Sequence, residues 1–239
     1  FLLQTVAWSA DLTVSAAASL TQAFQEISVQ FEVQHQGTKL KFNFGASGAL
    51  MQQIANGAPV DVFASADTDT MDKAVAKHLS KHDIAAVPDD VLVTPGCKQA
   101  VLYSLMATLD AGDEVLLLSP AWPSYDGMLR LLDCVPVHVP VKRDNYHPDF
   151  DALEAAVSSK TKAILLNSPN NPTGAVYNPE EIQRIVDFAI KHDLWILDDM
   201  IYATLVWTDY PYTSPASLEG GAERTITIGG WSKGWAMTG

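Results

Sequence analysis

The sequence has few of the residues that mark several common classes of protein. Cysteine occurs only at Cys97 and Cys134. Two cysteines are too few for a disulfide framework, and neither lies in a CxxC or Cys/His spacing that indicates a metal site. We interpret both as isolated core thiols, and we expect no metal. No apolar run approaches the roughly 20 residues that a membrane-spanning helix needs, so no membrane span is expected.

Basic residues are also scarce. The chain of 239 residues has 15 Lys and Arg against 28 Asp and Glu, which gives a net charge of −13. Residues 1–82 hold 5 basic and 7 acidic residues, so the rest of the chain carries most of the acidity. Backbone phosphates attract clusters of Lys and Arg, and the sequence has none. Nucleic acid is therefore excluded as a partner.

Hydrophobic periodicity predicts strands that alternate with helices along the whole chain. In the first part we expect strands at 12–16, 39–44 and 60–65, and helices at 20–31, near 50–54 and at 70–77. In the second part we expect strands at 114–118, 135–139, 162–167, 194–198 and 225–228, and helices at 99–109, 125–132, 150–157 and 179–192. This alternation is typical of parallel, doubly wound α/β sheets.

Two features of the sequence divide the chain into segments. A polar linker that contains Pro88 follows residue 79, and we place a domain boundary between residues 82 and 83. Residues 1–10 begin with an apolar run and end in small residues, which is typical of the end of a secretory signal. We expect 1–10 to be a signal remnant. A buried first strand or a frayed terminus is the alternative.

Lys233 and Asp199 are the two candidate residues for chemistry. Lys233 follows a short apolar strand, and a lysine can form a Schiff base with an aldehyde cofactor, although such a residue is more often a solvated charge. Asp199 follows an apolar strand whose carboxyl end is the edge at which ligands bind in open α/β sheets. A carboxylate there can keep a heterocyclic nitrogen protonated. A loop-capping role is the alternative, and the neighbouring Asp198 leaves the assignment open.

Three other segments carry groups that suit a cofactor. Residues 167–174 form a dense turn after a strand, with asparagine amides that can donate to a ligand. A glycine turn at Gly96 opens a helix and presents backbone N–H groups suited to a phosphate. Trp122 follows another strand and can stack on an aromatic ring.

The second part resembles the class I and II aminotransferases, which are fold type I pyridoxal-phosphate enzymes. The resemblance covers residues from about 84 to 239. It depends on the order and spacing of GCKQA at 96–100, SPAWPSY at 119–125, NNPTG at 170–174, Asp199 with Tyr202, and Ser232-Lys233 with AMTG at 236–239.

The resemblance implies a role for each matching residue. Lys233 would link to pyridoxal phosphate and move the substrate proton, and Asp199 would pair with the pyridine nitrogen. Tyr202 and Asn171 would bind the phenolic oxygen of the ring, and Trp122 would stack on it. Backbone amides of Gly96, Cys97 and Lys98 would hold the phosphate, and Ser232 would belong to the same site. The polar rest of residues 119–125 is interpreted as structural.

The sequence also departs from the family pattern. Family members carry a phosphate-binding arginine eight residues after the lysine, and the sequence ends two residues before that position, at Gly239. Met200 replaces an acidic residue, and Trp231 is bulkier than the residue usual there. The N-terminal arm and the small C-terminal domain of the family have no counterpart. We therefore expect an incomplete phosphate site and little turnover.

The first part places two serines at strand-to-helix turns. Ser19 and Ser47 are expected to be N-caps, and the alternative is that they bind an oxyanion at two helix N-termini. Residues 11–78, above all 15–21, 44–53 and 57–67, resemble the periplasmic molybdate-binding proteins of ABC transporters. In that family both serines would contact the oxyanion, but only part of one of its two lobes is matched.

The sequence thus predicts an α/β chain with an incomplete type II periplasmic-binding-protein lobe at 11–82 and the core of a fold type I large domain at 83–239. We expect amino-group transfer between an amino acid and a 2-oxo acid with pyridoxal phosphate, and a homodimer is an open alternative. A periplasmic molybdate-binding module and an inactive fusion or assembly artefact are the other functions considered. The second part indicates the cytoplasm and the first part indicates export. Uncovered sheet faces predict aggregation or oligomerisation.

Overall fold

The computed structural model describes residues 11–35 and 37–234, and the segment 1–10 expected to be a signal remnant lies outside them. The chain divides into two compact units. The first contains Phe1–Ser80 with Ala86–Val93, and the second contains Lys81–Ala85 with Thr94–Gly239. In the described part of the chain, no helix has the length and hydropathy needed to cross a membrane.

The first unit is a small parallel sheet with helices between its strands. The strands β1 (Asp11–Ala17), β2 (Lys39–Gly45) and β3 (Val62–Ala64) pair in the order β2-β1-β3. The helices are α1 (Thr21–Gln34), α2 (Ser47–Ala55) and α3 (Thr68–Leu79). Val14, Ala16 and Leu50 are buried, whereas α1 buries none of its residues. The core of this unit therefore lies between β1 and α2.

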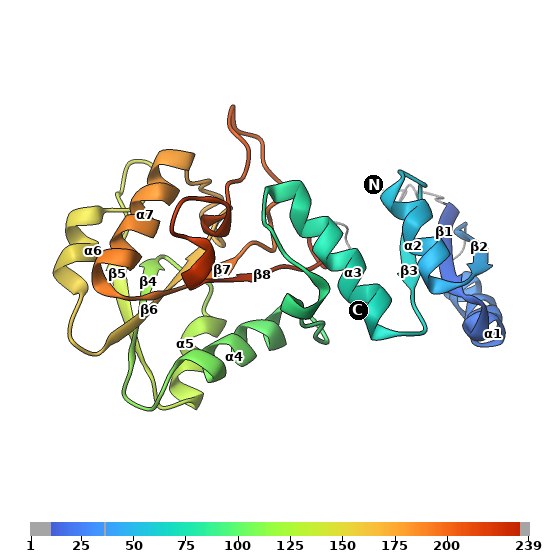
Figure 1. Cartoon of the computed structure of the whole chain (residues 1–239), viewed down its shortest axis with the longest axis horizontal. Helices are drawn as coiled ribbons and strands as arrows, with labels where there is room; N and C mark the ends of the chain where they lie inside the picture. Colours follow the sequence, from blue (N-terminus) through green and yellow to red (C-terminus); the bar gives the residue numbers. More distant parts are fainter. Residues whose placement is uncertain (1–10, 36, 235–239) are drawn as a thin grey trace, which may run out of the picture. The chain divides into compact units, whose positions relative to one another are not determined.

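The second unit is built on a five-stranded sheet (Figure 1). Its strands are β4 (Glu114–Ser119), β5 (Val135–Pro140), β6 (Thr161–Asn167), β7 (Trp195–Asp199) and β8 (Thr225–Ile228). They are all parallel, in the order β5-β4-β6-β7-β8. Because parallel strands end at the same edge, the segments that follow their carboxyl ends gather there.

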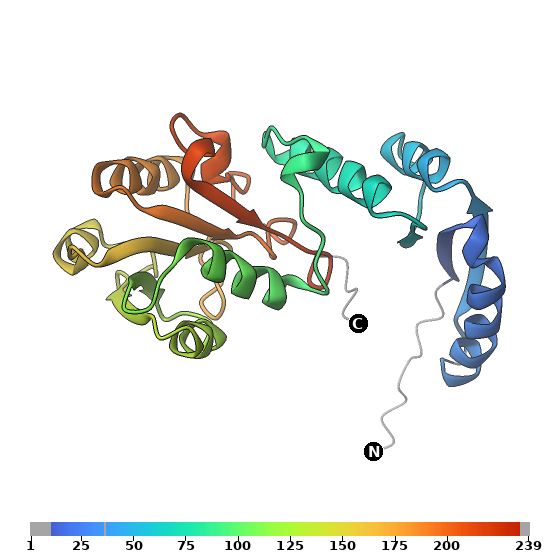
Figure 2. The same ribbon diagram turned by 60° about the horizontal axis from the view of Figure 1, so that its bottom comes forward.

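Helices cover both faces of this sheet. Alternate residues of β4 belong to different core clusters: Val115 and Leu117 pack with helices α4 (Cys97–Thr108) and α5 (Ser124–Leu131), whereas Leu116 and Leu118 pack with α6 (Phe150–Ala156) and α7 (Pro179–His192). Figures 1 and 2 show the green α4 and α5 on one side of the sheet and the yellow and orange α6 and α7 on the other. The period of two along each strand thus separates two cores.

Helix ends follow from local sequence. Helix α7 starts with Pro179 after Asn178, whose side chain accepts a hydrogen bond from Glu181 N, while the Glu181 carboxylate accepts one from Asn178 N. This capping box satisfies two backbone donors that have no partner inside the helix. Helix α7 ends at His192, and the C-cap residue Asp193 has φ 54°. Asp67 caps α3 by accepting a hydrogen bond from Thr70 N at 2.7 Å.

The strands and helices expected from periodicity are all present, with ends that differ by a few residues. The expectation that Ser19 and Ser47 are N-caps is wrong. Ser19 lies inside a short 3-10 helix (Ala18–Leu20) whose N-cap is Ala17, and Ser47 is the first residue of α2, whose N-cap is Ala46. The Ser47 hydroxyl instead accepts a hydrogen bond from Ala66 N at 3.0 Å, which joins α2 to the segment after β3.

Candidate active site

The two adjacent aspartates at the end of β7 face opposite sides of the sheet. Ile196 belongs to the core under α6 and α7, and Leu197 belongs to the core under α4 and α5. Strand alternation then places Asp198 on the first side and Asp199 on the second. The partners of the two carboxylates agree with this, because Asp199 contacts residues of α4 and α5. The structure therefore shows which of the two carboxylates faces α4 and α5, a question that the sequence leaves open.

Asp199 is a buried carboxylate held by donors from three segments. Tyr125 Oη donates to its Oδ2 at 2.6 Å, and Cys97 Sγ and Ile201 N lie 3.5 Å and 3.3 Å from its Oδ1. The residue is 2% exposed, and burial raises the pKa of its carboxyl group while the bond from Tyr125 opposes that rise. Burial, followed by the charge of Asp199, also raises the pKa of Tyr125 and of Cys97. Both neighbours therefore stay protonated as donors.

A chain of hydrogen bonds connects Asp199 to the next site residues. Asn167, at the end of β6, donates to the backbone oxygen of Asp199 at 2.8 Å and accepts from Asn171 N at 2.8 Å. Asn171 Nδ2 in turn lies 3.4 Å from Tyr202 Oη, to which it donates. Asn171 and Tyr202 thus lie close together, and both can donate a hydrogen bond to the same ligand oxygen.

The start of α4 lies beside the indole of Trp122. Lys98 Nζ lies 5.2 Å from the centroid of the Trp122 ring, and that ring meets Tyr125 edge-on with centroids 5.2 Å apart. Gly96 has φ 97°, a conformation that residues with a side chain rarely adopt. The N–H groups of Cys97 and Lys98 begin the helix and have no acceptor within it.

Lys233 and Ser232 lie on the loop after β8. A Cβ placed on Gly230 would be 2.9 Å from Ile201 Cδ1 and 3.7 Å from Cys97 Cβ, so this loop runs close to the residues around Asp199. Ser232 is partly buried and the Lys233 side chain is exposed. Among the residues that the structure describes, no hydrogen bond or ion pair joins Lys233 to Asp199, Asn171 or Tyr202. The loop that carries Lys233 thus runs close to the residues around Asp199, and the lysine itself is exposed.

Sequence reasoning missed Tyr125 and Asn167. The sequence indicates only a structural role for Tyr125, yet its hydroxyl makes the shortest hydrogen bond to the Asp199 carboxylate. Its spacing of three residues from Trp122, at the start of a helix, is a signal that could have placed both rings on one side. Asn167 carried no such signal, because its role depends on the pairing of Asn167 with Asp199 across β6 and β7.

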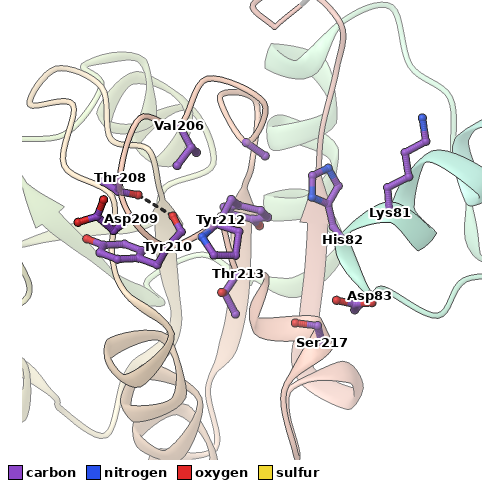
Figure 3. Close-up of a pocket in the computed structure, with 12 residues that line it drawn as sticks. Lys81, His82, Asp83, Val206, Thr208, Asp209, Tyr210, Tyr212, Thr213 and Ser217 are labelled. Atoms are coloured by element: carbon purple, nitrogen blue, oxygen red, sulfur yellow. Dashed lines mark hydrogen bonds between the residues drawn. The ribbon is translucent and has the colours of Figure 1, made fainter.

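Asp198 forms a separate buried cluster. Its Oδ2 accepts hydrogen bonds from Tyr212 Oη at 2.6 Å and Ser214 Oγ at 2.9 Å, and within the described residues its Oδ1 has no partner. Burial raises the pKa of Asp198 to about 7. Tyr212 also lines a cavity of about 510 Å³ with His82 and Tyr210 (Figure 3). This cluster ties the loop after Tyr202 to β7, on the side of the sheet away from Asp199.

The two serines of the first unit follow adjacent strand ends. Ala17 of β1 pairs with Gly45 of β2, so Ser19 and Ser47 leave the sheet at the same edge. Ser19 is exposed and Ser47 is buried. In the described ranges, no three His, Cys, Asp or Glu side chains gather as a metal site.

The similarity to known proteins extends beyond the second unit. The family model for aminotransferase class I and II matches residues 47–239. That match begins inside the segment 11–82, and the boundary between residues 82 and 83 stays a prediction. The aspartate aminotransferase of Musicola paradisiaca is 42% identical over 170 residues, which cover 70% of this chain and 42% of that protein. The aspartate aminotransferase of Pyrococcus abyssi is also 42% identical, over 70% of this chain and 44% of that protein.

Solved structures give the same result. The crystal structure of the aromatic aminotransferase from Pyrococcus horikoshii aligns with a TM-score of 0.69 and 40% identity, and covers 72% of this chain and 46% of that one. The chain therefore spans less than half the length of these relatives. The family model covers most of the chain, the identities are high, and the fold agrees with fold type I. The chain belongs to the pyridoxal-phosphate-dependent class I and II aminotransferase family.

Proposed function

We propose that the second unit binds pyridoxal phosphate at the carboxyl edge of its sheet, within an enzyme that transfers amino groups between an amino acid and a 2-oxo acid. The observation that carries this proposal is the buried carboxylate of Asp199, which ends β7 and is oriented by Tyr125 and Cys97. Ligands of open α/β folds bind at this edge.

The environment of Asp199 fits a cationic ring nitrogen. A carboxylate that is 2% exposed has lost most of its hydration, and this loss is why its pKa is raised. Within the described residues, the side chains that bond to it are the neutral donors Tyr125 and Cys97. A protonated pyridine nitrogen would supply the positive charge that a buried anion requires. The donor set therefore suits the cofactor of this family.

The other site residues have complementary tasks in this proposal. Trp122 would stack on the ring, and Asn171 and Tyr202 would donate hydrogen bonds to its phenolic oxygen. Backbone N–H groups of Cys97 and Lys98, after the turn at Gly96, bind the phosphate at the start of α4. Ser232 precedes Lys233 and is the last of the proposed cofactor-binding residues.

Lys233 is the proposed catalytic residue. Its Nζ would hold the cofactor by condensing with the aldehyde, with release of water. Once the amino group of the substrate has displaced it, the free amine would accept the proton from the substrate α-carbon and pass it on. When bound, pyridoxal phosphate supplies an electron-withdrawing ring that delocalises the electron pair left by that proton. Asp199 would keep the ring nitrogen protonated. Lys233 is exposed, on a loop that runs close to the residues around Asp199.

The test uses the chain with pyridoxal phosphate and borohydride, followed by digestion and mass spectrometry. The expected result is a reduced cofactor label on Lys233 that is absent in Lys233→Ala. Lys160→Ala is the matched control, because Lys160 is an exposed lysine at the opposite end of β6 and should leave labelling unchanged. The proposal is overturned by a wild-type chain that takes up no label, or by labelling in which Lys233 has no preference over Lys160.

A second candidate function concerns the first unit. The positions of Ser19 and Ser47 at the ends of adjacent parallel strands support an oxyanion contact of the kind found in molybdate-binding proteins. Calorimetry with molybdate tests it: heat of binding that disappears in Ser47→Ala supports the contact, and no heat with the wild-type chain rejects it. Ser28→Ala, on α1, is the matched control. The domain limits, export of the first part and a homodimer remain predictions.

A further inference from the structure

A histidine of the edge strand joins the two ends of the turn that carries Trp122. His138 lies on β5, and its Nδ1 is 2.7 Å from Ser119 Oγ at the end of β4. Its Nε2 is 3.0 Å from Asp126 Oδ1 in the first turn of α5. Residues 120–125 leave β4 and enter α5 between these two contacts. The imidazole therefore spans the base of this turn.

Each of these hydrogen bonds has one donor and one acceptor whether the imidazole is neutral or charged. A carboxylate only accepts, so Nε2 carries a hydrogen toward Asp126. In the neutral ring, Nδ1 accepts from the Ser119 hydroxyl. In the charged ring, Nδ1 donates to Ser119 Oγ, and the hydroxyl hydrogen turns to the backbone oxygen of Leu117, 3.3 Å away. Both ends of the turn stay bonded in each state.

The same three side chains are poorly suited to act as a nucleophile, base and orienting acid. Acyl transfer needs N–H donors for the developing oxyanion, and the residue after the nucleophile commonly supplies one. Pro120 follows Ser119 and has no N–H. The Ser119 backbone oxygen already accepts from Val141 N, so the strand end is fixed rather than open. The arrangement fits a structural role, and we call the two hydrogen bonds from His138 to Ser119 and Asp126 the tie.

The turn held by this tie carries two rings of the candidate site. Trp122 lies at its centre, and Tyr125 follows as the second residue of α5 and donates to Asp199. We propose that His138 is a positioning residue, which fixes Trp122 and Tyr125 relative to Asp199 by bonding to both Ser119 and Asp126. This inference rests on the proposed cofactor site, because the positions of these two side chains matter to function only if the cofactor ring binds beside Trp122 and Asp199.

Three variants test the tie. His138→Phe keeps a ring but removes both bonds, and Asp126→Ala removes one. Asp126→Asn keeps an oxygen that accepts from Nε2 and serves as the conservative rescue. The matched control is His192→Phe, because His192 Nε2 bonds to Glu154 Oε2 at 2.9 Å in a comparable pair at the end of α7. Each variant is measured by hydrogen–deuterium exchange of residues 119–128 without cofactor, and by the Kd for pyridoxal phosphate.

Loss of one hydrogen bond in Asp126→Ala and of two in His138→Phe, at a half-exposed site, predicts exchange roughly threefold or more faster in both variants, with pyridoxal-phosphate affinity weakened by a similar factor. Asp126→Asn and His192→Phe should match the wild type in both measurements. Unchanged exchange in His138→Phe would overturn the tie, and faster exchange with unchanged affinity would overturn its positioning role. If the wild-type chain binds no cofactor, the proposed function fails, and the exchange data alone still decide whether His138 holds the turn.

Discussion

The hydroxyl of Tyr125 donates a hydrogen bond of 2.6 Å to Oδ2 of Asp199, and this bond joins the first turn of α5 to the end of β7. Both groups are almost completely buried. A hydrogen bond to an ionised group in a dry site is stronger than one at the surface. Tyr125 therefore orients the carboxylate and favours its ionised form, which is the form that a cationic ring nitrogen requires.

Tyr125→Phe is expected to weaken pyridoxal-phosphate binding by about tenfold, because the carboxylate loses the donor that orients it and favours its ionised form. The phenyl ring keeps its packing against α4, but the same bond exists in the chain without cofactor, so the melting temperature should fall as well. The measurement is the Kd from an absorbance titration. Tyr146→Phe, at an exposed tyrosine outside the site, is the control. Equal affinities for Tyr125→Phe and wild type would show that Tyr125 is structural, as the sequence indicated.

The positions of strands and helices could be predicted from sequence because each element has a clear period. The heptad-like spacing in residues 179–192 and the short apolar runs of β6 and β7 leave few alternatives. The edge at which Asp199, Asn171 and Lys233 would gather followed from the rule for parallel sheets. These are local patterns or general rules of topology, and neither requires knowledge of side-chain contacts.

The contacts within the site could not be predicted in the same way. Asp198 and Asp199 are consecutive, so only the register of β7 against its two cores shows which carboxylate faces α4 and α5. Asn167 gains its role from pairing with a strand that lies about 30 residues later. Ser47 failed as an N-cap because helix α2 includes it and a distant backbone N–H claims its hydroxyl. What the sequence could not show in these cases is which partner, distant in the sequence, each side chain contacts.

The raised pKa of the Asp198 carboxyl group predicts how the stability of the fold changes with pH. Burial raises the pKa of this carboxyl group from its ordinary 3.8 to about 7, so between these values the folded chain holds a proton that the unfolded chain releases. The contribution of the group to stability is fully present below about pH 4 and is lost as the pH rises through about 7. The melting temperature of the wild type should therefore fall between pH 5 and 8.

Asp198→Asn removes this titration and should flatten that fall, since an uncharged amide has nothing to ionise. Melting curves from pH 5 to 8 measure the slope. The buried Asp199 also has a raised pKa, but it is present in both proteins and largely cancels in the comparison. Asp209→Asn, at an exposed aspartate of the same loop, should keep the wild-type slope. Parallel curves for wild type and Asp198→Asn would contradict the account.

Asn167→Ala removes two hydrogen bonds at once, the one to the backbone oxygen of Asp199 and the one from Asn171 N. Because all three groups are buried or partly buried, we expect a loss of about 2 kcal/mol in the free energy of unfolding. The measurement is urea denaturation. Asn145→Ala, at an exposed asparagine, is the control, and a loss no larger than its own would contradict a structural role for Asn167.

Gly234 limits the space beside the proposed catalytic lysine. A Cβ at this position would lie 1.9 Å from Thr204 Oγ1 and 3.2 Å from Thr204 Cβ. In Gly234→Ala, either Thr204 or the loop that carries Lys233 must therefore shift, because rotation of the threonine hydroxyl still leaves its Cβ at 3.2 Å. A shift of this kind should slow covalent labelling of Lys233 by pyridoxal phosphate by about three- to tenfold, because such reactions depend on close alignment.

The second mutation separates crowding from other causes. Thr204→Ala keeps the Cβ at 3.2 Å, so the double variant with Gly234→Ala should recover only part of the labelling rate. Thr204→Gly removes every atom that the new methyl group meets, and its double variant should recover nearly the whole rate. The single Thr204 variants provide the reference rates, since non-additivity of neighbouring mutations measures their coupling. If the double variants label no faster than Gly234→Ala alone, the glycine is required for some reason other than its approach to Thr204.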